Sequence, residues 1–380
     1  MTEERAFWLA WSQIQGVGPI SLQRLQRHFG TLAAAWDANA ASLEAVEGFG
    51  PQMIKRVLLV RSHLQPIQFL KEHQQQNPHF WTPADADYPR LLFEIADPPP
   101  VLYYRGKIDP LENQGIAHTI GIVGTRNPSE YGRRWTRKLT HSLAQRGFTI
   151  ISGLAEGIDA EAHHSCLKAG KRTIAVLGTG VDVVYPWRNK RLYEEILKCG
   201  LVISEHPTGT APDRTHFPRR NRIIAALSRA ILVMEAGTKS GALITAHCAN
   251  NYNRDVYVLP GSLDSPRSLG CLSLANQGAQ LIQGEAHLLS LLGAMPPLAV
   301  VDTAPETPRE QPPPPDLEPD LAQVFQKLTD LSENSPAEPV PLDSIVQHVD
   351  LAPGIVSSAL LQLELLGLVT QMPGMRYQRR

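Results

Sequence analysis

The chain has 380 residues, of which 43% are hydrophobic and 19% are charged. This length predicts about two to four domains, and this hydrophobic content excludes a wholly disordered chain. No apolar run is long enough for a membrane span, the N-terminus is too acidic for a secretory signal, and the four cysteines form no CxxC pair. We therefore expect a cytoplasmic protein with reduced thiols and no metal site.

The charge is distributed unevenly along the chain. The formal net charge is −1, yet residues 115–284 contain 21 Lys and Arg against 12 Asp and Glu, so the remainder is acidic. A basic centre between acidic flanks favours a polyanion as the ligand of the central region.

Residues 1–77 have the apolar periodicity of helices and contain two similar turns, Ile14–Pro19 and Val46–Pro51, each with the pattern Gly-x-Gly-Pro. The repeat resembles a tandem helix–hairpin–helix module, whose turns can present backbone N–H groups to a phosphate. The alternative is a helical bundle in which the glycines only turn the chain. A series of prolines between residues 78 and 100 ends this segment.

Residues 78–294 alternate between short apolar, β-branched runs and helical segments. This alternation predicts an α/β domain with a doubly wound, mostly parallel sheet. The predicted strands are 119–123, 149–151, 173–177, 201–203, 230–234 and 256–259, and the predicted helices are 133–145, 160–169, 190–197, 220–227 and 242–250.

Glycine-rich loops follow four of these predicted strands, at residues 124–132, 152–159, 178–180 and 235–241. In a parallel sheet such loops share one edge, and glycines there let the backbone approach a phosphate closely. A GxGxxG motif opening the first helix and a Walker-type GxxxxGK[ST] motif are both missing from the sequence. The loops therefore favour phosphate binding without a redox dinucleotide cofactor.

The last part of the chain divides into a linker and a small domain. Residues 295–319 are acidic and proline-rich, which predicts an extended linker. Residues 320–380 have the outline of a winged helix, with predicted helices at 321–329, 342–349 and 355–366 and a hairpin at 368–377 that turns at Pro373-Gly374. The third helix has no Lys or Arg, so we favour a protein contact or a structural role over DNA-groove reading.

One segment of the central domain is distinctive, Phe-Pro-Arg-Arg-Asn-Arg-Ile-Ile-Ala-Ala-Leu-Ser at residues 217–228. Together with Ile122–Arg126, Ser152–His163, Ser240-Gly241 and Leu259–Ser262, it resembles the DNA-processing protein family DprA, also called Smf, over most of residues 80–290. The resemblance implies an extended Rossmann-like core between a small α-helical N-terminal domain and a C-terminal winged helix. It also implies a non-catalytic protein that binds single-stranded DNA, helps load the RecA recombinase in natural transformation, and dimerises through its core without a cofactor.

Arg126 is the leading candidate for a phosphate contact, because a guanidinium matches the geometry of phosphate oxygens; a salt bridge to Glu130 or Asp159 is the alternative. For Phe217, base stacking competes with a core or hinge role. At least one of the arginines of the 217–228 segment is expected to be structural. The full set of predicted DNA-binding residues is Gly124, Arg126, Ser152, Gly153, Gly157, Arg214, Phe217, Arg219, Arg220, Asn221, Arg222, Lys239, Ser240, Gly241 and Thr245.

Three positions depart from the family pattern: Thr125, Ala242 and, most seriously, Glu156, which brings a carboxylate to a loop expected to face DNA. It either points away or pairs with a neighbouring arginine. The competing function is that of a nucleotide-processing enzyme, such as a phosphoribohydrolase of the lysine-decarboxylase-like Rossmann group. That group carries a PGGxGTxxE-type segment, which this sequence lacks. Asp159 and Glu161 are not expected to form a catalytic pair.

Overall fold

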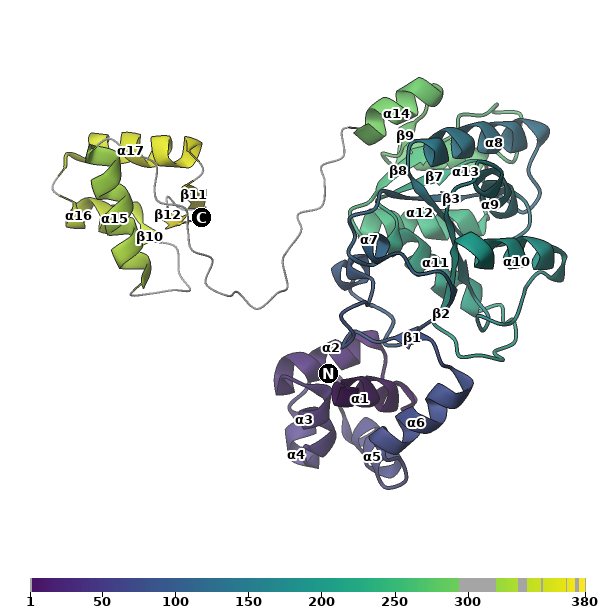
Figure 1. Cartoon of the computed structure of the whole chain (residues 1–380), viewed down its shortest axis with the longest axis horizontal. Helices are drawn as coiled ribbons and strands as arrows, with labels where there is room; N and C mark the ends of the chain where they lie inside the picture. The colour runs from purple at the N-terminus through teal and green to yellow at the C-terminus, as the bar shows by residue number, and fades with distance from the viewer. Residues whose placement is uncertain are drawn as a thin grey trace. The chain divides into compact units, whose positions relative to one another are not determined.

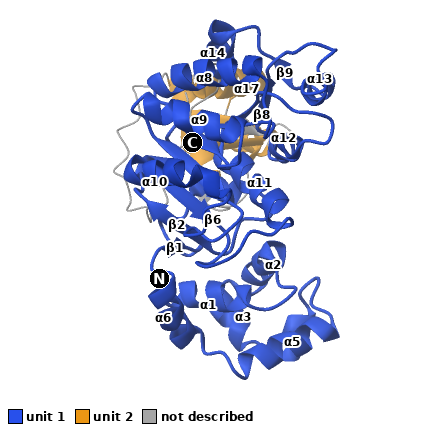
Figure 2. Ribbon diagram, turned by 90° about the vertical axis from the view of Figure 1, so that its right-hand side faces the viewer, with its two compact units in different colours: residues 1–301 blue, residues 302–380 orange. Residues whose placement is uncertain are grey.

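The computed structural model describes residues 2–293, 319–333, 340–349, 351–366, 368–372 and 376–379. They fall into two compact units, residues 1–301 and 302–380, coloured separately in Figure 2. The linker predicted for 295–319, apart from Pro319, and the turn at Pro373-Gly374 lie outside the described residues. In the part of the chain that is described, no helix is both long enough and apolar enough to cross a membrane.

The first unit begins with six helices that pack around buried tryptophans. The Trp11 ring meets the Trp36 ring edge-on at a centroid distance of 5.3 Å and the Phe49 ring at 6.4 Å. The helices are α1 (Thr2–Ser12), α2 (Pro19–Phe29), α3 (Leu32–Asp37), α4 (Ala40–Glu44), α5 (Pro51–Arg61) and α6 (Pro66–Gln76) (Figure 1).

The two Gly-x-Gly-Pro turns join α1 to α2 and α4 to α5. The first glycine of each turn has a φ of 91–92°, in the left-handed region that favours glycine, and the proline opens the following helix. Arg24 of α2 donates to the carbonyl of Glu47 at 3.1 Å, and the equivalent Arg56 of α5 donates to that of Gln15 at 3.4 Å. The sequence repeat is therefore a pair of equivalent turns that brace each other.

A nine-stranded sheet forms the centre of the first unit, in the order β1-β2-β6-β5-β4-β3-β7-β8-β9. Strands β3 to β9 are parallel to one another, whereas β2 pairs antiparallel with both β1 and β6. The strands are β1 (Phe80–Trp81), β2 (Leu102–Gly106), β3 (Thr119–Val123), β4 (Thr149–Ser152), β5 (Thr173–Leu177), β6 (Leu201–Ser204), β7 (Ala230–Val233), β8 (Asp255–Val258) and β9 (Gln280–Leu281).

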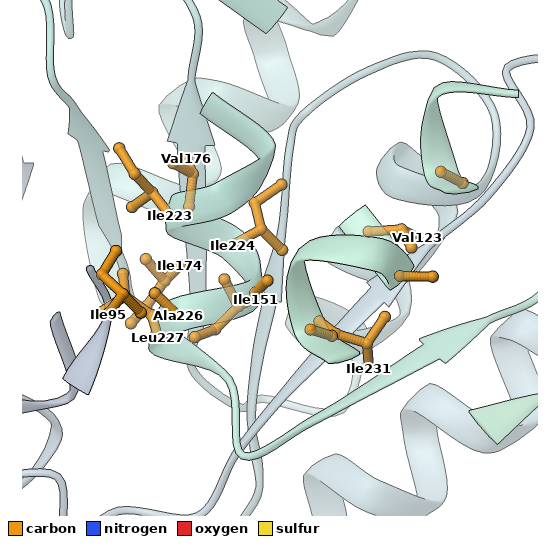
Figure 3. Close-up of a cluster of buried hydrophobic side chains, with 14 of the residues drawn as sticks. Ile95, Val123, Ile151, Ile174, Val176, Ile223, Ile224, Ala226, Leu227 and Ile231 are labelled. Carbon is orange, nitrogen blue, oxygen red and sulfur yellow. The ribbon is translucent and has the colours of Figure 1, made fainter. Parts of the chain in front are cut away.

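Helices cover both faces of the sheet. Successive residues of a strand point to opposite faces, so both sets of side chains are buried. Ile150 packs with α8, α9 and α14, while Ile151 packs with α11, α12 and α13. Figure 3 shows the cluster in which Ile223 and Ile224 of α11 contact Ile151 and its neighbours. The helices are α7 (Pro110–Asn113), α8 (Glu130–Gln145), α9 (Ile158–Lys168), α10 (Lys190–Cys199), α11 (His216–Leu227), α12 (Gly241–Asn251), α13 (Leu269–Asn276) and α14 (Glu285–Gly293), with the 3-10 helices η1 (Arg90–Glu94) and η2 (Trp187–Asn189).

The strand order contains one topological switch point. Strand β3 lies between β4 and β7, so the chain winds outward in one direction through β4, β5 and β6 and in the other through β7, β8 and β9. This is the doubly wound, extended Rossmann-like fold that the sequence predicts. In such folds, ligands bind beyond the carboxyl ends of the strands at the switch point. The loops after β3, β4, β5 and β7 meet this edge.

The second unit is a small winged helix with its own core. Val324, Ile345, Val356 and Leu360 are fully buried in it. Its described elements are α15 (Pro319–Glu333), α16 (Leu342–His348), α17 (Pro353–Leu365), β10 (Val340–Pro341), β11 (Val369–Met372) and β12 (Arg376–Arg379), and the sheet order is β10-β12-β11. Strand β10 is an addition to the predicted three helices and hairpin.

Candidate nucleic-acid interface

A small pocket of about 120 Å³ lies beyond the carboxyl ends of β3, β4 and β5, and it unites loops that are far apart in the sequence. The loop after β3 contributes Arg126, and the first two turns of α11 contribute Phe217 and Arg220. The full lining consists of Arg126, Gly153, Ala155, Glu156, Tyr185, Pro186, Phe217 and Arg220. Four of the predicted site residues therefore line this pocket, together with four that the prediction did not include.

Arg126 is the exposed cation of the pocket. Its guanidinium lies 5.8 Å from the centroid of the Phe217 ring. Neither predicted acidic partner is in use for it: Glu130 pairs with Arg137 at 2.7 Å, and Asp159 accepts the N–H of Gly153. Within residues 2–293, Arg126 makes no ion pair, so its charge is available to an anionic ligand.

Phe217 lies in the first turn of α11, because this helix begins at His216, four residues before the helix predicted at 220–227. Pro218 is compatible with a helix here because the first turn needs no N–H donor. The half-buried Phe217 ring lies 5.4 Å from the Tyr185 ring, tilted by 33°. It also covers Gly178, where an added Cβ would come within 2.9 Å of it. The ring is thus held in place while part of its surface faces the pocket.

The loop after β4 is tightly packed, which alters the role predicted for its donors. The Ser152 hydroxyl is buried and donates to the carbonyl of Ile122 at 2.6 Å. The Asp159 carboxylate accepts the N–H groups of Gly153 at 3.1 Å and Ala155 at 3.4 Å. The Ser152 hydroxyl and the Gly153 N–H, predicted as phosphate donors, are therefore used inside the protein. Their contribution is to the shape of the loop.

Backbone conformation explains two glycines of these loops. Gly157 has a φ of 81°, and a Cβ there would lie 2.4 Å from the carbonyl oxygen of Thr125. A Cβ on Gly124 would lie 2.6 Å from the side chain of Ile158. Both positions need glycine so that the loops after β3 and β4 can pack against each other.

Arg220 is buried rather than exposed to ligand, with an exposed fraction of 5%. Its guanidinium donates to the carbonyl of Gly153 at 2.6 Å and also to that of Val176. Burial lowers the pKa of Arg220 to about 10, while Asp159 raises it and Arg126 lowers it further. Burial also raises the pKa of Asp159, against the opposing effects of Arg220 and the backbone N–H groups. This buried pair fixes the loop after β4 to α11.

Arg222 and Thr245 also belong to the protein interior. Arg222 forms ion pairs with Glu205 at 2.6 Å and Asp97 at 3.2 Å, and Thr245 is 1% exposed. Direct DNA contact by Ser152, Arg220, Arg222 and Thr245 is therefore corrected to a supporting role. For Arg220, Arg222 and Thr245 the physical reason is helical geometry, because neighbouring positions on α11 and α12 point in different directions and some must face the sheet.

Other predicted residues lie outside the pocket lining, in the loops after β6 and β7 and in the first turns of α11 and α12. Arg214, Arg219 and Lys239 are exposed and, in the described part of the chain, form no ion pair. Asn221 donates to the carbonyl of Gly241 at 3.1 Å, which ties α11 to the start of α12. Ser240 is the N-cap of α12, where its hydroxyl accepts the N–H of Ala242 at 3.3 Å. Arg126, Arg214, Arg219 and Lys239 are thus the predicted cations that are exposed and form no ion pair among the described residues.

Of the two orientations expected for Glu156, pointing away or pairing with a neighbouring arginine, the structure has the second. Its carboxylate lies 3.4 Å from the guanidinium of Arg188, and both side chains are substantially exposed. Exposed pairs of this kind are weak, so an incoming phosphate can compete for Arg188.

Sequence reasoning identified residues 178–180 of the segment between β5 and α10 but missed residues 185–189. Tyr185 and Pro186 line the pocket, and Arg188 pairs with one of its lining residues. The available signal was an aromatic and basic run, Tyr-Pro-Trp-Arg-Asn-Lys at residues 185–190, placed shortly after a predicted strand. Two histidines were also missed: His206 stacks on His216 at 3.9 Å, and burial lowers the pKa of His206 to about 4.

The acidic and imidazole groups near the loops have structural partners. Glu161 lies 3.7 Å from both Arg133 and Arg137, and the buried Glu235 accepts from the Ser129 backbone N–H at 2.8 Å. The buried His163 shares a hydrogen bond with Thr173 at 2.7 Å. Among the described residues, no cluster of three or more His, Cys, Asp or Glu side chains is arranged to hold a metal ion.

Comparisons with known proteins extend over both units. A family model described as DNA recombination-mediator protein A matches residues 79–293, and one described as the DprA winged helix domain matches residues 308–375. The chain is 53% identical to protein Smf of Synechocystis over 99% of both chains. It is 42% identical to DNA processing protein DprA of Streptococcus pneumoniae, over 58% of this chain and 76% of that one.

Two solved structures are similar as well. The crystal structure of DNA processing protein A from Streptococcus pneumoniae aligns with a TM-score of 0.66 and 32% identity, covering 75% of this chain and 97% of that one. The structure of DNA processing protein A from Helicobacter pylori, described for its single-stranded DNA binding mode, aligns with a TM-score of 0.51 and 31% identity, covering 56% and 95%.

Proposed function

This chain belongs to the DNA recombination-mediator protein A family, also named DprA and Smf, and from that premise we propose that it binds single-stranded DNA at the pocket beside the switch point of its sheet. Membership of the family confirms the resemblance predicted from the segment at residues 217–228. The observation that carries the proposal is the exposed Arg126 guanidinium beside the held Phe217 ring. This pairs a phosphate-binding cation with a surface on which a base can stack.

Further exposed cations could extend the site beyond the single nucleotide that Arg126 and Phe217 would bind. Arg214, Arg219 and Lys239 are exposed cations without ion pairs in the described residues, and they surround the same sheet edge. Cations that follow a backbone, with aromatic rings that accept any base, are typical of binding without sequence preference. Gly124, Gly157, Ser240 and Gly241 shape the loops that present these side chains, and Gly153, Arg220 and Asn221 hold those loops together.

We propose binding rather than catalysis as the activity of this site. The carboxylates nearest to it have other roles: Asp159 holds the backbone of the loop after β4, and Glu156 pairs with Arg188. The role of Arg220 is likewise structural. These assignments favour a DNA-binding site over the phosphoribohydrolase alternative, which needs an acid or base free to act on its substrate.

The finer parts of the proposal rest on family resemblance. We propose that the chain acts in the cytoplasm, protects incoming single strands, helps load RecA in natural transformation or recombination, and forms a homodimer through its core. The edge strand β9, with both residues exposed, and the exposed Leu263 and Leu269 of the segment between β8 and β9 support a protein contact by this part of the core. Sedimentation of the chain and capture of purified RecA are the measurements that test these two partners.

The proposed function is tested by oligo(dT) binding across a salt series. We expect affinity to fall steeply with salt, and Arg126→Ala to reduce the slope of log affinity against log salt by about 0.7, the value of one single-strand phosphate contact. Lys198→Ala is the matched control, because this exposed lysine lies at the end of α10, next to the opposite edge of the sheet. An unchanged slope in a folded Arg126→Ala protein removes Arg126 from the site, and salt-independent binding refutes the function.

A further inference from the structure

Trp187 stands apart from the other five tryptophans because it is 69% exposed, whereas Trp8, Trp11, Trp36 and Trp81 are buried at 8% or less and Trp135 is half-buried. It lies in η2, between β5 and α10. A large exposed aromatic side chain on a structured segment is a feature of binding surfaces.

The residues on both sides of Trp187 are fixed to the rim of the pocket. Tyr185 and Pro186, which precede it, line the pocket. Arg188, which follows it, lies 3.4 Å from Glu156 of the pocket lining. The next residue, Asn189, is buried and donates to the carbonyl of Leu154 at 2.9 Å. The backbone of Trp187 is therefore held beside the pocket while its indole ring faces solvent.

Two aromatic residues of the segment after β5, Tyr185 and Trp187, lie beside or near the pocket. The Phe217 ring lies 5.4 Å from that of Tyr185, and Tyr185 is itself 42% exposed. Trp187 follows two residues later, and the ammonium of Lys190 lies 4.6 Å from its ring centroid. Phe217 and Trp187 thus each have a cation beside the ring, Arg126 for Phe217 and Lys190 for Trp187.

We propose that Trp187 and Lys190 form a second stacking position for single-stranded nucleic acid, occupied by a nucleotide that extends beyond the pocket. This inference rests on the proposed function and adds a subsite to it. Any base can stack on the indole face, and Lys190 supplies charge for the adjoining phosphate. The ion pairs Arg188–Glu156 and Lys190–Glu194, at 3.4 and 3.9 Å, join exposed side chains, so a phosphate can replace the carboxylates at little cost.

The test combines the affinity of a labelled oligo(dT) series with the intrinsic fluorescence of the full chain. A second position is filled only when the strand is long enough, so Trp187→Leu should weaken the longer oligomers by about five- to a hundredfold and leave the shortest bound oligomer unaffected. Trp187→Phe keeps an aromatic ring and should retain most of the affinity. Wild-type emission should be quenched on binding, and Trp187→Phe should lose most of that quenching because it removes the exposed indole.

Phe93→Leu is the matched control, since Phe93 is 51% exposed but lies on η1, outside the pocket lining. It should leave affinity and quenching unchanged. If the wild-type chain binds with the expected salt dependence but Trp187→Leu retains full affinity at every length, the second position is refuted and the proposed function stands. If the wild-type chain fails to bind oligo(dT), both proposals are refuted.

Discussion

The buried Arg220 guanidinium gives the most direct test of how the site is built. It donates to the carbonyls of Gly153 and Val176 and is the charged neighbour of the buried Asp159. Arg220→Met keeps a long, flexible side chain and removes these donors and the charge. Two carbonyls then lose this donor, and Asp159 is left as a buried carboxylate without the nearby positive charge.

The expected loss of stability follows from those partners. A buried acceptor left without a donor costs about 1–3 kcal/mol, and a buried carboxylate that loses the nearby positive charge adds to this cost. These costs overlap because the same guanidinium serves all three groups. We therefore expect Arg220→Met to lower the free energy of unfolding by about 3–5 kcal/mol at pH 7.

The loss should depend on pH through Asp159. Burial already raises the pKa of Asp159 in the folded chain, so the folded state binds this proton more tightly than the unfolded state does. Stability is therefore lost as pH rises from the unfolded-state pKa of Asp159 to its higher folded-state pKa. Removing the positive charge of Arg220 raises the folded-state pKa further. The variant should thus be closest to wild type at acidic pH and furthest from it at neutral pH. Adding Asp159→Asn, which keeps an acceptor oxygen, should recover part of the loss at pH 7.

Urea denaturation at several pH values measures these differences. Arg219→Met on the same helix is the matched control, because Arg219 is exposed and its replacement should change stability by no more than about 0.5 kcal/mol. Equal midpoints for Arg220→Met and Arg219→Met would refute the buried, bracing role of Arg220. A constant difference across pH would show that Asp159 is not the group coupled to it.

Two further predictions concern the surface of the site and the second unit. Phe217→Leu should weaken oligo(dT) binding by about 1–3 kcal/mol and have a smaller effect on thermal stability. Fluorescence anisotropy measures the affinity, and calorimetry measures the stability. Lower stability with preserved affinity in the folded fraction would assign Phe217 to the core instead. A chain ending at residue 293 should keep most of its affinity for single-stranded DNA, because the described residues of α17 include no Lys or Arg. Loss of binding on this truncation would show that the winged helix contacts the DNA.

The sheet was largely predictable because its strands are buried on both faces. Continuous apolar runs at residues such as 119–123 and 173–177 leave few alternatives to a parallel strand, and the structure has strands at these positions. Strands β1, β2 and β9 were missed. Two of them are only two residues long, and β2 follows a run of three prolines that was interpreted as a break. These edge strands depend on the pairing partner more than on their own sequence.

The loops of the site were predictable, but the orientation of their side chains was not. Residue spacing places Arg219, Arg220 and Arg222 on one helix, yet only the packing of α11 against the sheet makes Arg220 buried and Arg219 exposed. The segment at residues 185–190 was missed for a related reason. Its role depends on contact with the loop after β4, through Asn189 and Arg188, and that contact joins residues about 35 positions apart.

The same packing changes the source of the positive charge at the site. Glycine-rich loops suggest backbone N–H donors for phosphate, but Asp159 already accepts those of Gly153 and Ala155. The buried carboxylate and the buried Arg220 thus stiffen the loop after β4, so the proposed anion binding depends on exposed side chains such as Arg126 and Lys239. Binding that depends on side-chain cations rather than on backbone dipoles releases counterions, and therefore weakens steeply with salt. The salt slope consequently measures the site directly, and each exposed arginine or lysine should account for its own part of it.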